Sequence, residues 1–197
     1  MRRAMPKVPI CVLRPTIIVG DSTTGEVDRL DGPYLLILLM LTSPADFAMP
    51  LPGRGDLQLN LVPVDYVARA ASIIGRDPRA VGKTFHLADP SALTSRRVFE
   101  LVARAGGRRT PRGFIPANVT KALLRAPGVE RFLRSPRAFL ETLGTNTKYS
   151  TRNTDEILAG TDVRCPPFES YVDTIVAHAR GRLRERRLAK ETHNPLD

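Results

Sequence analysis

The sequence contains no tryptophan, and aromatic residues make up only 6% of its 197 positions. Proteins that stack bases or sugars on aromatic side chains need several such platforms, so this mode of binding is disfavoured. The chain also has only two cysteines, Cys11 and Cys165, and three histidines. So few ligands, so far apart, build neither a disulfide framework nor a metal cluster. We therefore expect reduced, packed thiols in a cytoplasmic protein with no metal site.

Long hydrophobic runs are absent as well. The apolar segment over residues 35–41 is about ten residues too short to cross a bilayer. The N-terminus carries charges with no apolar segment behind them, which is not the pattern of a signal peptide. The sequence therefore predicts no membrane span.

Charge is plentiful and unbalanced. Lys and Arg number 30 against 20 Asp and Glu, a net charge of +10, and an excess of this size raises nucleic acid or an anionic surface as a partner. Much of the excess lies near the two ends, and the arginines from Arg180 onward go around a predicted helix without lining one face. A solvated basic helix end is the favoured interpretation, and a phosphate-contacting patch is the alternative. Nucleic acid is therefore an unexpected partner.

The front of the chain has the pattern of an α/β fold. The apolar run over residues 8–13 ends at Arg14-Pro15 and is typical of a strand buried on both faces of a parallel sheet. Further strands are predicted near residues 57–61 and 83–87, and a buried helix over residues 34–41. A second helix follows, with Asp65 as its cap and Gly75 as its end. Its predicted inward face consists of Val64, Val67, Ala68, Ala71 and Ile74.

The remainder of the chain reads as helical. Helices are predicted from Ser95 to Gly106, over residues 117–125 and 129–143, and over 155–159 with Thr154 as the cap. A last helix covers residues 169–188, and its predicted inward residues are Val172, Ile175, Val176 and Ala179.

The loop that follows the first strand is rich in Gly, Asp, Ser and Thr but lacks a phosphate-binding pattern. Gly20, Gly25 and Gly32 do not have the offsets of a nucleotide cradle, and the chain has neither G-x-G-x-x-G nor Gly-Lys-Ser/Thr. The loop hydroxyls have no sequence signature of an activating base, and His86 is interpreted as a structural residue. The sequence alone therefore predicts no catalytic residue.

The stretch LRPTIIVGDSTTGEVDRLDGPY, residues 13–34, carries a resemblance. It is similar to the segment that follows the catalytic Tyr and Lys in extended short-chain dehydrogenase/reductases, the NAD-dependent epimerase/dehydratase superfamily. The Gly-Asp-Ser-x-Thr-Gly continuation and the later Asp-Gly-Pro-Tyr resemble the thioester reductase and fatty acyl-CoA reductase branch. Three further blocks resemble the family in the same order: NLVPVDYVA (60–68), FHLADP (85–90), and residues 149–154 with 158–160 followed by CPPFESY (165–171).

The resemblance implies the C-terminal part of a Rossmann-type parallel sheet together with a mostly helical substrate-binding subdomain. Residues 1–90 would belong to the NAD(P)-binding domain and its substrate loop, residues 91–180 to the helical subdomain, and residues 181–197 to a basic tail. The family holds NAD or NADP on a Gly-rich turn and uses a Tyr-x-x-x-Lys pair, and none of the four tyrosines here has that lysine. Alone, the chain is therefore expected to bind NAD(P) weakly or not at all and to be inactive.

Candidate contacts come from the same resemblance. The backbone after the strand-end proline typically meets the nicotinamide carboxamide, which corresponds to Pro15, Thr16, Ile17 and Ile18; plain strand-end packing is the alternative. Asp21 and Ser22 would line the acyl side, with loop capping as the alternative. Many thioester reductases have Gly where this chain has Thr16, whose Cβ restricts a close approach of the backbone.

The expected partners are a small-molecule acyl or carbonyl substrate and an upstream half of the enzyme or a second copy of the chain. A sugar-nucleotide epimerase or dehydratase of the same fold is the alternative activity. A non-catalytic basic binding protein is the alternative from a different class.

Overall fold

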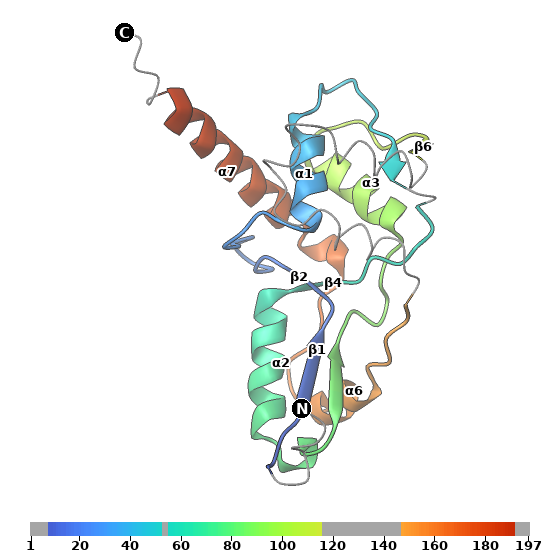
Figure 1. The fold of residues 1–197 in the computed structure, drawn as a ribbon, viewed down its shortest axis with the longest axis vertical. Coiled ribbons are helices and arrows are strands. Elements are labelled where there is room, and N and C mark those ends of the chain that lie inside the picture. Colours follow the sequence, from blue (N-terminus) through green and yellow to red (C-terminus); the bar gives the residue numbers. More distant parts are fainter. Residues whose placement is uncertain (1–7, 53–54, 116–146, 192–197) are drawn as a thin grey trace.

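The computed structural model describes residues 8–52, 55–115 and 147–191 (Figure 1). The helices expected over residues 117–125 and 129–143 lie outside the described residues. In chain order the described elements are β1 (Val12–Pro15), β2 (Ile17–Val19), α1 (Pro33–Thr42), β3 (Leu51–Pro52), β4 (Leu61–Pro63), α2 (Val64–Arg76), β5 (Thr84–Leu87), α3 (Ser95–Ala105), β6 (Phe114–Ile115), α6 (Arg152–Leu158) and α7 (Val172–Glu191).

The named strands pair in parallel, β1 with β5, β2 with β4, and β3 with β6. The expected α/β class with parallel strands is therefore confirmed. β1 and β2 are consecutive in the chain and change partner at their junction, since Pro15 is in register with Leu87 and Ile17 with Leu61. The segment formed by β1 and β2 therefore pairs first with β5 and then, after Thr16, with β4.

The first strand differs from its prediction in both length and burial. It begins at Val12, and Val8 is 50% exposed. Within the described residues β1 has one hydrogen-bonded neighbour, β5, so one edge of the strand stays open. Val12 and Leu13 are half-buried, and Arg14 and Pro15 are exposed. The expected burial on both faces was therefore wrong.

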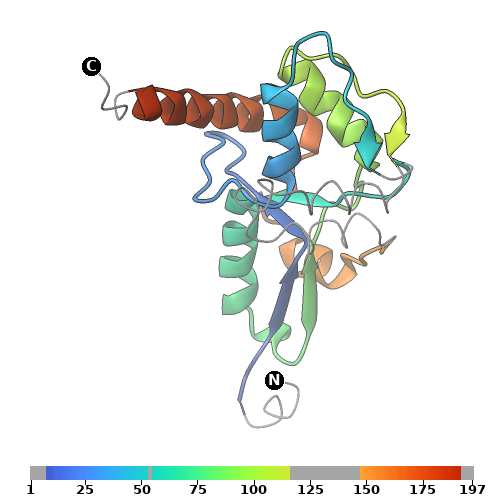
Figure 2. The ribbon, with the colours of Figure 1, turned by 45° about the horizontal axis from the view of Figure 1, so that its top comes forward.

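Two hydrophobic cores hold the molecule together. One joins α1, α3 and α7 with β2, and the other joins α2, β5 and α6. Figures 1 and 2 show the second group with α2 and α6 flanking the pair of β1 and β5, and the first group beyond the end of that pair. Both cores take residues from each side of residue 90.

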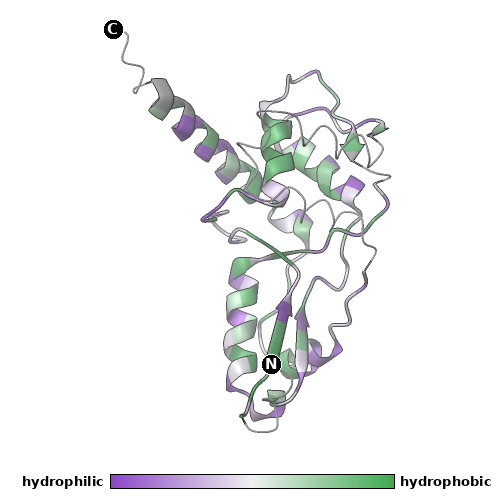
Figure 3. Ribbon diagram, in the orientation of Figure 1, coloured by the Kyte–Doolittle hydropathy of each residue, from purple (hydrophilic) through white to green (hydrophobic). Residues whose placement is uncertain are grey.

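The helices follow their predictions closely where one face alone is apolar. The predicted inward residues of α7 are all buried, and its later, basic part is mainly hydrophilic (Figure 3). The segment expected as a basic tail from residue 181 thus continues α7 as far as Glu191. α1, apolar on all sides, forms as expected over residues 34–41, but it is buried on one side only, since Leu39 is 50% exposed.

Two helix details were wrong. In α2 the buried residues are Tyr66, Ala70 and Ile74, while Val64 is 41% exposed, because this stripe, at a spacing of four residues, packs against α6 and β4. Thr154 does not cap a helix, since α6 begins at Arg152. The Thr154 hydroxyl is buried and donates to His86 O at 2.8 Å, which satisfies a group that would be costly to leave unpaired.

Within the described part of the chain, no helix combines the length and the apolar character that a membrane crossing requires.

Candidate functional site at the strand ends

The side-chain amide of Asn60 holds the end of β1 by hydrogen bonds. Thr16 Oγ1 donates a hydrogen bond to Asn60 Oδ1 at 2.8 Å. Asn60 Oδ1 also accepts a hydrogen bond from Asp89 N at 2.9 Å, and Asn60 Nδ2 donates to Asp89 O at 2.8 Å. Asn60 therefore ties together the ends of β1 and β5 just before its own strand, β4, begins. Because carboxyl ends of parallel strands share one edge, this is the edge where open α/β sheets bind ligands.

The four predicted cofactor contacts lie at this edge. Pro15 is exposed at the end of β1, and the side chain of Ile18 in β2 is 43% exposed. The backbone nitrogens of Thr16 and Ile17 donate to Leu87 O and Asn60 O, at 3.1 and 3.2 Å. These two N–H groups are thus occupied by the sheet, and Pro15 has none. The structure therefore shows strand-end packing of these residues beside an exposed apolar surface.

The substrate loop begins with a tightly satisfied aspartate. The Asp21 carboxylate accepts hydrogen bonds from Thr23 N at 2.8 Å, Thr23 Oγ1 at 2.5 Å and Thr24 N at 3.0 Å. The hydrogen bond from the Thr23 hydroxyl, followed by those from the backbone, lowers the pKa of Asp21. Asp21 thus has the loop-capping geometry that was the alternative to a substrate contact.

Ser22 connects the loop to α2. Its backbone nitrogen and its hydroxyl donate to the two carboxylate oxygens of Asp65, at 2.9 and 2.8 Å. The interpretation of Asp65 as a helix cap was wrong, because the residue at the cap position is Pro63 and no side chain caps this helix. The carboxylate sits in the first turn, where the helix dipole favours it, and binds the loop instead.

Two loop glycines are required by close approaches. A Cβ on Gly20 would lie 2.5 Å from Gly25 O, and Gly20 N donates to the Tyr34 hydroxyl of α1 at 2.8 Å. Gly25 has a φ of +73°, and a Cβ there would lie 2.5 Å from Thr174 O in α7. These glycines let the loop pack closely against α1 and α7. Their positions in the sequence follow from these contacts and not from the offsets of a phosphate-binding loop.

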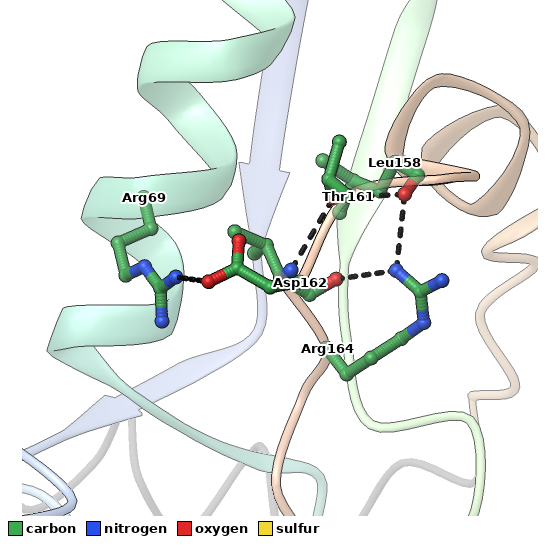
Figure 4. A network of polar contacts seen from close by, with 6 residues as sticks. Arg69, Leu158, Thr161, Asp162 and Arg164 are labelled. Carbon is green, nitrogen blue, oxygen red and sulfur yellow. Dashed lines mark hydrogen bonds and ion pairs between the residues drawn. The ribbon is translucent and has the colours of Figure 1, made fainter.

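A cavity of about 260 Å³ opens between α2, the end of β5 and α6. Its lining includes Tyr66, Asp155, Arg164 and Cys165. Figure 4 shows polar contacts of the neighbouring elements: Arg69 Nη2 lies 2.6 Å from Asp162 Oδ2, and Arg164 Nη1 donates to Leu158 O at 3.0 Å. The ion pair joins α2 to the turn after α6, and the arginine contact satisfies a carbonyl at the end of α6.

Burial keeps two side chains of this cavity, Cys165 and Tyr66, in their neutral forms. Burial raises the pKa of the Cys165 thiol to about 12, and the nearby Asp89 and Asp65 carboxylates act in the same direction. Burial also raises the pKa of Tyr66. A thiol of this kind is a poor nucleophile because the reactive form is the thiolate. Tyr66 and Cys165 were not identified as site residues from the sequence, where only their position in family-like blocks marked them.

His86 has the structural surroundings that its strand position suggested. Its Nδ1 lies 3.2 Å from Ser150 O, and its ring centroid lies 5.7 Å from that of Tyr149. Among the described residues, no three His, Cys, Asp or Glu side chains are grouped as metal ligands. The arrangement as a whole can bind and orient a ligand at the strand ends, and within the described residues it presents no tyrosine and lysine pair for proton transfer.

Comparison with known proteins agrees with this geometry. Residues 1–71 match the NAD-binding family model described as male sterility protein. The non-canonical nonribosomal peptide synthetase FrzA of a Cladobotryum species is 33% identical over 110 residues, covering 54% of this chain and 10% of that protein.

Two solved structures show the fold. The terminal R domain from the myxalamid PKS-NRPS biosynthetic pathway has a TM-score of 0.65 at 20% identity, covering 92% of this chain and 47% of that one. UDP-glucuronic acid 4-epimerase from Bacillus cereus, in complex with NAD, has a TM-score of 0.59 at 10% identity, covering 89% and 46%. The chain thus spans about half the length of these two structures and a tenth of FrzA.

Proposed function

We propose that the chain forms the substrate-side part of an NAD(P)-dependent reductase. The match of residues 1–71 to the family model described as male sterility protein and the fold shared with the myxalamid R domain support this proposal. The substrates of this reductase would be acyl thioesters or related carbonyl compounds. The Gly-rich βαβ unit and the Tyr-x-x-x-Lys pair would come from a segment outside this sequence. We place the activity in the cytoplasm, in keeping with two cysteines that are both free thiols.

The observation that supports the proposal is the set of hydrogen bonds that Asn60 forms at the strand ends. Asn60 holds Thr16 and Asp89 at the edge where parallel sheets bind ligands, and residues 15–18 lie at that edge with Ile18 43% exposed. The Thr16 hydroxyl is directed to Asn60, so its side chain is held back by the sheet. In the complete enzyme, residues 15–18 would border the nicotinamide, and the loop with Asp21 and Ser22 would border the acyl group.

The chemistry needs groups that this chain does not supply. A bound nicotinamide provides the hydride for the substrate carbonyl carbon, and the carbonyl oxygen must receive a proton from a general acid. The tyrosines nearest the site are buried: the exposed fractions of Tyr34, Tyr66 and Tyr171 are 2%, 5% and 1%. In our proposal they are structural, and the chain alone neither holds NAD(P) tightly nor turns over.

Steady-state assays of two proteins test this function. The purified chain is expected to show no NADPH or NADH oxidation with acyl thioesters, and the protein extended upstream to include a Gly-rich βαβ unit is expected to release the aldehyde or alcohol. Turnover by the chain alone would contradict the proposed division of roles. An extended protein that is inert on every thioester and carbonyl compound would contradict the function itself.

A sugar-nucleotide epimerase or dehydratase is the second candidate. It is favoured by the likeness to the Bacillus cereus epimerase, which covers 89% of this chain. Conversion of a UDP-sugar by the extended protein, with no reduction of thioesters, would decide for this candidate.

A further inference from the structure

A second cavity lies away from the strand ends, where the C-terminal ends of α1 and α3 meet the side of α7. Its volume is about 310 Å³, and it is lined by Leu41, Thr42, Arg108, Arg180, Leu183 and Arg184. Half of these residues are arginines and none is acidic. Figure 1 shows the three helices converging here.

Two of the arginines are held in place by helix-end carbonyls. Arg108 Nη2 donates to Leu41 O in the last turn of α1, and Arg180 Nη2 donates to Gly106 O at the end of α3, at 2.8 Å. Gly106 permits this convergence, because a Cβ there would lie 2.8 Å from Leu41 Cδ2. The guanidiniums are therefore positioned by backbone geometry.

The three arginines of this cavity keep N–H donors that the helix-end carbonyls do not use. Arg108 Nε is buried and has no hydrogen-bond partner in the described part of the chain. Arg184, on the exposed side of the cavity, forms no ion pair or side-chain hydrogen bond with any residue that the structure describes. A buried N–H without a protein partner is uncommon, and the Nε–H of Arg108 is therefore a donor that a bound group can use.

The charges of the cavity do not balance. The C-terminal ends of two helices contribute about half a negative charge each. Against this stand three guanidiniums, so the cavity keeps a net charge of about +2. Like charges that converge in a hollow raise the local positive potential and attract an anion.

We propose that this cavity is a binding site for a phosphate group, formed by Arg108, Arg180 and Arg184. Guanidinium forks match phosphate oxygens in pairs, and a phosphate offers enough oxygens to engage three of them. The site is independent of the proposed reductase function. It lies at the opposite end of α1 from the contact between Tyr34 and Gly20, about 11 Å further along the helix axis.

Binding of inorganic phosphate to the full chain tests the site. We expect saturable binding by calorimetry at low ionic strength that weakens as salt is added. In a ¹⁵N-labelled sample, the Nε–H resonance of Arg108 is expected to shift along the same titration curve, which a purely structural arginine would not do. Glycerol phosphate and acetate are titrated in the same way. Tighter binding of glycerol phosphate than of inorganic phosphate indicates a phosphorylated organic ligand. Tighter binding of acetate than of phosphate would overturn the phosphate assignment.

Arg184→Gln is the test variant because its side chain forms no contact that the fold needs. Arg186→Gln, on an exposed part of the same helix outside the cavity, removes the same charge and is the matched control. We expect phosphate affinity to fall about tenfold or more in Arg184→Gln, the effect of losing one charged hydrogen-bond pair, and to change little in the control. Equal affinities in both variants, or no binding at low salt, would overturn the proposal.

Discussion

Asp65 binds Ser22 twice, through Ser22 N at 2.9 Å and Ser22 Oγ at 2.8 Å, although 43 residues separate them in the sequence. The contact joins the substrate loop to the first turn of α2. A loop held in this way keeps its shape before any ligand arrives, and this limits the entropy lost on binding.

Replacing Asp65 with alanine should loosen the loop. Hydrogen bonds to a charged group contribute roughly 1.5 to 3 kcal/mol, so we expect a loss of about 2 kcal/mol in the free energy of unfolding. Urea denaturation measures this loss, and amide exchange at Ser22 should accelerate. Asp28→Ala, at an exposed loop carboxylate, is the control and should change neither quantity. Unchanged exchange at Ser22 in Asp65→Ala would refute the role.

Asn60→Ala should release the strand ends. Three side-chain hydrogen bonds are lost, at about 1 kcal/mol each, so a destabilisation of roughly 3 kcal/mol is expected. Thr16→Val removes one of them and should cost about 1 kcal/mol. In a double-mutant cycle of urea denaturation, the two changes should be non-additive. Strict additivity would mean that the hydroxyl and the amide are not coupled.

Gly20→Ala should be destabilising by about 2 kcal/mol or more, because its Cβ would lie 2.5 Å from a backbone oxygen. Gly75→Ala, in α2 with no atom near its Cβ position, should instead stabilise by about 0.5 to 1 kcal/mol. Thermal unfolding of the two variants gives the comparison. A neutral Gly20→Ala would show that the loop does not need this close approach.

Stability should fall above about pH 8.5 because of Cys165. Its pKa is raised to about 12 in the folded chain, so the unfolded thiol ionises first, near pH 8.5, and the unfolded state is favoured as the pH rises. The melting temperature measured from pH 8 to 9.5 should decline less in Cys165→Ala than in the wild type. Identical slopes would show that the thiol ionises equally in both states.

Self-association is expected through the open edge of β1 and the apolar surface beside it, where Ile18 is 43% exposed. Ile18→Lys should shift the distribution toward monomer in light scattering. Phe47→Lys changes a side chain that is 52% exposed in the loop after α1 and serves as the control. A wild-type chain that is monomeric at high concentration would contradict this prediction.

Local patterns in the sequence determined most elements of the fold. An apolar face repeated at helical spacing predicted the buried residues of α7, because such a pattern allows one way to bury its surface. A continuous apolar segment predicted where α1 lies but not which of its sides is buried. The blocks around Arg14-Pro15 and Asn60 carried the family resemblance because each is a short run of consecutive residues that can be compared without knowing the fold.

Tertiary structure alone decided which partner each polar group found. Asp65 could cap its own helix or bind Ser22, and Thr154 could cap α6 or donate to His86; the sequence offers both choices, and long-range packing selects one. The same holds for the arginines of the second cavity. Arg180 and Arg184 lie one helical turn apart in α7, and Arg108 joins them only because α1 and α3 end against the side of α7.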